Sequence, residues 1–113
     1  MRLRFISRSI APDVTACRLR RAAHVLATPQ GDEVVLFDTA RERYYTLNEV
    51  GASMWALLAE PKTLDELVAA IRREYQVPTG RTPDPIREDV ARLLRDLHVA
   101  GMLLAERPST HAS

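Results

Sequence analysis

The chain has 113 residues, 46% of them hydrophobic, which suits one globular domain with a modest core and leaves no room for a second ordinary domain. Its formal net charge is +1, from 16 basic and 15 acidic residues, so overall charge gives no attraction to nucleic acid or to a membrane surface. The single cysteine, Cys17, excludes an internal disulfide and favours a reducing, cytoplasmic location. We expect neither a membrane span nor a secretory signal, because the apolar runs are too short for either.

Residues 1–22 are predicted to form a basic arm. They contain six arginines but only one acid, Asp13. The segment LRFIS at residues 3–7 has the composition of a strand, although Pro12 argues against one continuous element. We expect a solvated, partly mobile arm, with a short strand as the alternative.

Three short segments then have the composition of strands, and turn-forming residues separate them. They are residues 23–28 (AHVLAT), 33–38 (EVVLFD) and 43–48 (RYYTLN). In the second segment Val35 and Phe37 would face one side and the even-numbered residues the other, because side chains alternate along a strand. Two short connections between three short strands predict an antiparallel meander.

Three helices are predicted after the meander, each with an apolar stripe at helical spacing. The stripes are Val50, Met54, Leu57 and Leu58; Leu64, Leu67, Val68, Ile71 and Tyr75; and Ile86, Val90, Leu93, Leu94 and Leu97. Asn48, Thr63 and Asp84 are placed to cap the three N-termini, the second within the capping box TLDE. Pro61 ends the first helix and Gly101 the third.

A meander of this size cannot bury one face unaided, so the helices must cover it. The sequence therefore predicts an α+β, winged-helix-like domain, with a three-stranded antiparallel sheet followed by three helices. The apolar segment MLLA at residues 102–105 is expected to fold back onto the core. We predict the folded domain at residues 23–105 and a flexible tail at residues 106–113.

No pattern in the chain points to catalysis. The three histidines, His24, His98 and His111, lie far apart and at no metal-ligand spacing with Cys17 or an acid. The four glycines are not clustered, so a glycine-rich phosphate loop is not expected. We expect no catalytic residue, no metal and no cofactor.

A winged-helix fold raises DNA binding as the alternative function, with the third helix as the reader. Between residues 84 and 100 this helix carries three arginines against four acidic residues. Phosphates would be repelled by such a face, although the arginines of the N-terminal arm would still reach a DNA backbone.

The paired tyrosines of the third strand give a more specific indication. Tyr44 and Tyr45 would point to opposite sides of the strand. As the last strand of a meander, the strand has an edge whose N–H and C=O groups lack a partner unless the chain supplies one. An extended peptide can pair with such an edge, and the third helix would form the other wall of its groove.

Three segments of the chain resemble the PqqD family. They are VVLFDTARERYYTLNEVGASMWALL, TLDELVAAIRREYQV and IREDVARLLRDLHVAGML, and the resemblance runs from about His24 to Leu104. The most diagnostic features are the tyrosine pair, Leu47-Asn48, Gly51 and an apolar helix that carries Trp55. The chain departs from many relatives at Glu42, where they have glycine, and in its longer N-terminal arm.

The family includes pyrroloquinoline quinone biosynthesis protein D and the recognition elements of ribosomally made, modified peptides (RiPPs), among them leader-binding halves of split lasso-peptide B proteins. The resemblance implies a non-catalytic protein that binds a precursor's leader as an added strand and presents it to a modifying enzyme, such as a radical-SAM enzyme or a leader peptidase. It implies neither a nucleic-acid nor a membrane partner. The positions that carry over as peptide-binding are Arg43, Tyr44, Tyr45, Thr46 and Leu47 of the third strand and Ile86, Asp89, Val90 and Leu93 of the third helix.

Overall fold

A computed structural model describes residues 13–78 and 84–106. One three-stranded antiparallel sheet has the order β2-β3-β4. Its strands are β2 (Val25–Gln30), β3 (Glu33–Asp38) and β4 (Arg43–Leu47). Leu36 lies opposite Tyr45, and Val34 lies opposite Leu47. The predicted meander is therefore confirmed, with strand bounds close to those expected.

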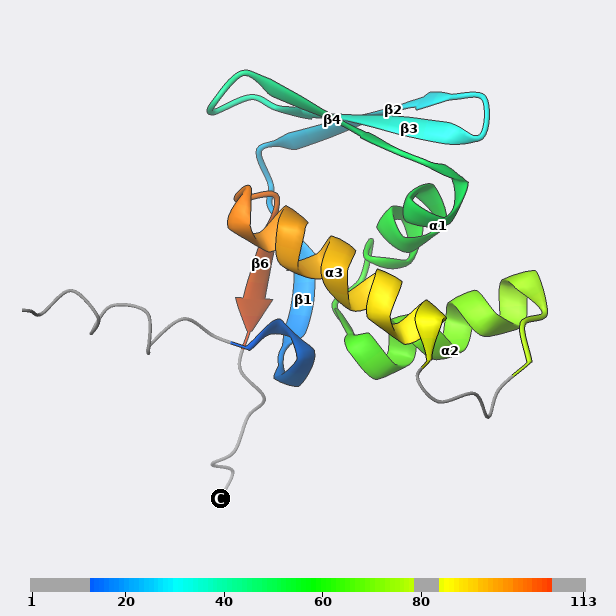
Figure 1. Ribbon diagram of the computed structural model, residues 1–113. Helices are drawn as coiled ribbons and strands as arrows, with labels where there is room; N and C mark the ends of the chain where they lie inside the picture. The colour runs from blue at the N-terminus through cyan, green and yellow to red at the C-terminus, as the bar shows by residue number, and fades with distance from the viewer. Residues whose placement is uncertain (1–12, 79–83, 107–113) are drawn as a thin grey trace, which may run out of the picture.

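The two faces of this sheet differ. Val34 and Leu36 of β3 are buried, whereas Val35 and Phe37 lie on the other face and are partly exposed. This is the division that the alternation predicts. Helix α1 packs against β3 and β4 on the inner face, and none of the described helices covers the outer face (Figure 1).

The three predicted helices are α1 (Glu49–Leu57), α2 (Leu64–Tyr75) and α3 (Pro85–Val99). The Asn48 side chain accepts a hydrogen bond from the Gly51 N–H at 2.9 Å, which caps α1. Thr63 and Glu66 form the predicted capping box of α2. Asp84 caps α3 by accepting from two main-chain N–H groups. All three predicted caps are confirmed, and the chain has the α+β, winged-helix-like fold expected.

A second antiparallel sheet was not predicted. Its order is β5-β1-β6, with β5 (Lys62–Thr63), β1 (Arg18–Arg21) and β6 (Leu103–Glu106). The segment that begins at Met102 does fold back as expected, since Met102 and Leu103 are buried and β6 pairs with β1. The sheet forms beneath α3 and away from β2-β3-β4 (Figure 1).

The expectation of a solvated arm is wrong for its C-terminal part. Residues 13–22 contain the 3-10 helix η2 (Val14–Ala16) and strand β1, and Val14, Cys17 and Leu19 are buried. Apolar burial of these side chains holds the segment on the domain despite its arginines. The alternative strand at residues 3–7, the link at 79–83 and residues 107–113 of the predicted tail lie outside the described residues.

Both sheets and all three helices contribute to one apolar core. The core includes Trp55, whose ring lies 5.0 Å from the guanidinium carbon of Arg21. The Nε atom of Arg21 also donates to the Trp55 carbonyl at 3.0 Å, so β1 is joined to α1. Within residues 13–78 and 84–106, no helix is long and apolar enough to cross a membrane.

Candidate functional site

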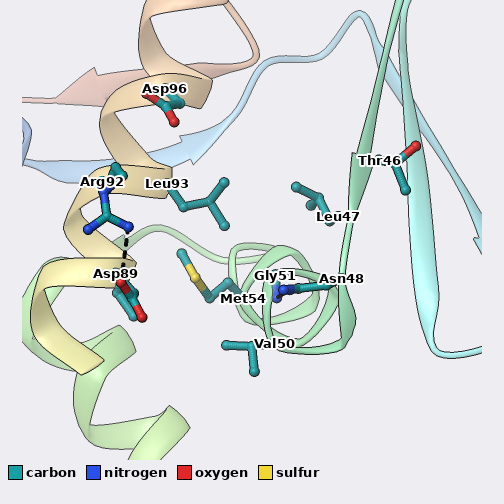
Figure 2. Close-up of a pocket in the computed structure, with 11 residues that line it drawn as sticks. Thr46, Leu47, Asn48, Val50, Gly51, Met54, Asp89, Arg92, Leu93 and Asp96 are labelled. Atoms are coloured by element: carbon teal, nitrogen blue, oxygen red, sulfur yellow. Dashed lines mark hydrogen bonds and ion pairs between the residues drawn. The ribbon is translucent and has the colours of Figure 1, made fainter. Parts of the chain in front are cut away.

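A groove of about 480 Å³ lies between the end of β4, the start of α1 and one side of α3 (Figure 2). Its lining residues come from all three elements. They are Thr46, Leu47, Asn48, Val50, Gly51, Met54, Asp89, Val90, Arg92, Leu93 and Asp96.

The floor of the groove is apolar. Leu47, Met54 and Val90 are buried, Leu93 is partly exposed and Val50 is exposed. Leu47 and Leu93 point toward one another from opposite walls (Figure 2). A side chain inserted between them would remove apolar surface from water on both walls.

Gly51 sets how closely these walls approach. A Cβ atom at this position would lie 3.1 Å from the Leu47 Cβ and 3.3 Å from the Leu93 Cδ2. Glycine therefore allows the first turn of α1 to lie against β4 and α3 together. A Cβ atom at this position would require Leu47 or Leu93 to shift by a few tenths of an ångström.

The rim that α3 provides is charged and mostly acidic. The Asp89 Oδ1 and Arg92 Nη1 atoms are 3.0 Å apart, and both side chains are exposed. Asp96 lies one turn further on and has no ion-pair partner among the described residues. Two carboxylates and one guanidinium leave the rim with an excess of negative charge.

The other border of the groove is a strand edge. β4 is at the end of its sheet, and within the described chain it pairs only with β3. Alternate residues of such a strand direct their N–H and C=O groups away from the sheet. Thr46 and Leu47 point to opposite sides of β4 (Figure 2). Because β4 is an edge strand, the groove offers main-chain groups beside an apolar floor.

The two walls are tied together at one end by the turn between β3 and β4. The buried Asp38 carboxylate accepts from the main-chain N–H groups of Ala40 and Arg41, at 2.9 and 3.1 Å. The Arg41 guanidinium lies 3.4 Å from Asp38 Oδ2 and donates to the Ala100 carbonyl at the end of α3. Burial opposes ionisation of Asp38, but these N–H groups and the nearby His24 and Arg41 side chains outweigh it, so the pKa of Asp38 lies below its usual value.

Comparison with known proteins identifies the family. The family model described as coenzyme PQQ synthesis protein D (PqqD) matches residues 33–103. The chain belongs to the PqqD family. A solved structure, described as TbiB1 in complex with the TbiA(beta) leader peptide, is 34% identical and has a TM-score of 0.56. That match covers 74% of this chain and 93% of the TbiB1 chain. No curated protein matches the chain.

The PqqD match includes every residue that lines the groove. It begins at β3 and therefore leaves out β1 and β2. The groove thus belongs to the part of the chain that is shared with the family. The described residues contain no group of three or more His, Cys, Asp or Glu side chains placed to hold a metal ion.

Five of the nine residues predicted to bind peptide lie together in this groove of the PqqD domain. They are Thr46, Leu47, Asp89, Val90 and Leu93. The exposed fraction of Val90 is only 2%, so its side chain is part of the core as well as of the floor.

The other four predicted residues lie outside the groove lining. Arg43 and Tyr44 are exposed on β4, and the exposed fraction of Tyr44 is 71%. Tyr45 points inward and packs against the core. Ile86 is partly buried at the start of α3 and also packs against the core.

Sequence reasoning missed six lining residues as parts of a site. They are Asn48, Val50, Gly51, Met54, Arg92 and Asp96. The sequence identifies Asn48 as a cap, Val50 and Met54 as stripe positions and Gly51 as a family feature. It does not show that these four residues lie near α3. That placement follows from the packing of α1 against α3, which the spacing of residues along the chain does not specify.

Proposed function

We propose that this chain is a non-catalytic leader-peptide recognition protein, which binds the leader of a ribosomally made precursor as an additional strand on β4. The observation that carries the proposal is the free edge of β4 beside an apolar groove. The similarity to TbiB1, which is described in complex with a leader peptide, supports it.

Main-chain hydrogen bonds would supply affinity that is largely independent of leader sequence, and the groove would supply selectivity. β4 has five residues, enough for a paired segment of roughly 17 Å. Alternate leader side chains would point inward, onto Leu47, Val50 and Leu93. The acidic rim at Asp89 and Asp96 favours a leader in which a basic residue accompanies the apolar anchor.

The proposal is tested by titrating the protein with the two halves of its precursor in separate calorimetry experiments. Short reading frames beside the gene of this chain would be searched for the precursor. We expect the leader half to bind with a dissociation constant of roughly micromolar or tighter, which corresponds to about −8 kcal/mol. The core half should bind much more weakly. Equal affinity for the two halves would contradict leader recognition.

The partner to which the leader is presented is also part of the proposal. A radical-SAM enzyme or a leader peptidase fits a protein that holds a leader for another protein to modify. Co-purification with enzymes encoded beside the chain, with and without the leader, would identify the partner. We place this step in the cytoplasm, where a precursor is made and Cys17 stays reduced.

A further inference from the structure

The outer face of the β2-β3-β4 sheet carries an apolar row that the proposed groove does not use. Leu26 lies opposite Phe37, and Phe37 lies opposite Tyr44, so the three side chains cross all three strands on one face. Leu26 is 57% exposed and Tyr44 is 71% exposed. None of the described helices covers this face (Figure 1).

Tyr44 is the end of this row on β4, the edge strand that borders the groove. Its ring centroid is 4.7 Å from that of Phe37, with an angle of 35° between the ring planes. This contact holds the Tyr44 ring over the sheet in the unbound protein. A neighbouring side chain would therefore meet an aromatic surface that Phe37 and Tyr44 form together.

A strand paired with β4 would bring its own side chains beside Tyr44. Residues directly opposite each other on neighbouring strands have Cβ atoms about 4.5–5.5 Å apart and share a face of the sheet. The leader residue opposite Tyr44 would lie on the outer face. The leader residue opposite Leu47, three positions away, would lie on the inner face above the groove.

We propose that Tyr44 is a specificity-determining residue, which packs against an apolar or aromatic leader side chain on the outer face of the sheet. This inference rests on the proposed function, and it adds a second recognition face to the groove. A preferred leader would then have two apolar anchors, separated by an odd number of positions, one on each face of the added strand.

Leu26 provides a matched control within the same row. It is large, apolar and exposed like Tyr44, but it lies on β2, the strand at the opposite edge of the sheet from β4. Adjacent strands are about 4.8 Å apart, so the leader strand would be about three such spacings from Leu26. Leu26 would therefore not touch a leader bound on β4.

The test measures binding of a fluorescein-labelled synthetic leader, from the cognate precursor, by fluorescence polarisation. We expect Tyr44→Thr to weaken binding about twofold to fivefold, the range for one cross-strand aromatic pair. Tyr44→Phe should bind like the parent, because the ring is retained. Leu26→Thr should also bind like the parent. Circular dichroism melts would show that the variants remain folded.

An alanine scan of the leader, measured against the parent and against Tyr44→Thr, makes the test specific. Alanine at one leader position should weaken binding to the parent protein but should weaken binding to Tyr44→Thr much less. Such non-additive losses would show direct coupling between Tyr44 and that leader residue. Parent-like binding by Tyr44→Thr, or an equal loss in Leu26→Thr, would overturn the inference while the proposed function stands. Failure of the parent to bind any leader would instead overturn the proposed function.

Discussion

At the scale of single residues, Glu42 shows a conformation that its side chain disfavours. It is the last residue of the turn between β3 and β4, and its φ is 57°, in the left-handed region. Glycine reaches this region without strain, whereas a residue with a Cβ atom pays roughly 1–2 kcal/mol. The chain therefore keeps a turn suited to glycine and tolerates glutamate in it.

We expect Glu42→Gly to raise the free energy of unfolding by about 0.5–1 kcal/mol, because relief of strain exceeds the extra entropy of glycine in the unfolded chain. Urea denaturation would measure the change. Glu33 is the matched control, because it is an exposed residue at the start of β3, just after the other turn of the sheet, and its φ is not positive. Glu33→Gly should lower stability, because glycine adds entropy to the unfolded chain and relieves no strain there. A Glu42→Gly protein no more stable than the parent would show that the turn is not strained.

At the scale of elements, the predictable features are the local ones. Caps such as Asn48 and Thr63 act on N–H groups three residues away, so the sequence shows them directly. The β5-β1-β6 sheet joins Arg18 to Thr63 and to Glu106, and no local pattern encodes such distant pairs. β1 reads RLRR, a strand whose single apolar residue, Leu19, is fully buried.

In the candidate site, too, local features can be predicted from the sequence and contacts between distant segments cannot. The sequence predicts an edge strand and a facing helix, because strand order and helical stripes are visible in it. It does not show which residue of the α3 stripe is buried in the core and which is exposed at the groove. Val90 is almost fully buried, whereas Leu93, three residues later, is partly exposed at the groove. This difference depends on how α1 packs against α3 at Gly51.

Leu93 is therefore the appropriate probe of the α3 wall. Leu93→Glu would place a carboxylate beside the apolar anchor of the leader, at a cost of roughly 1–3 kcal/mol, so leader affinity should fall about tenfold or more. Val99→Glu is the matched control, because Val99 is on the same helix, is 85% exposed and does not line the groove. Calorimetry with the leader would measure both. A folded Leu93→Glu protein that binds leader as tightly as Val99→Glu would show that α3 is not a wall of the site.

At the scale of the whole molecule, charge separates leader recognition from the winged-helix alternative. The net charge is +1, so any affinity for DNA must come from a local basic surface. On α3, Arg87 and Arg92 form ion pairs with Asp65 and Asp89, at 2.6 and 3.0 Å. These guanidinium groups would have to give up their carboxylates to bind phosphate.

We expect no complex with random duplex DNA at low micromolar protein and physiological salt, because few phosphates would be neutralised and phosphate neutralisation supplies most non-specific affinity. An electrophoretic mobility shift assay would measure this. The double variant Asp89→Asn, Asp96→Asn is the matched control, since it removes the two groove acids and leaves Arg92 without its partner. A weak, salt-sensitive shift in this variant alone would show that the acidic rim is what prevents DNA binding. A clear shift with the parent, falling steeply as salt is raised, would instead favour the DNA-binding function and contradict the use of α3 as a wall for a leader.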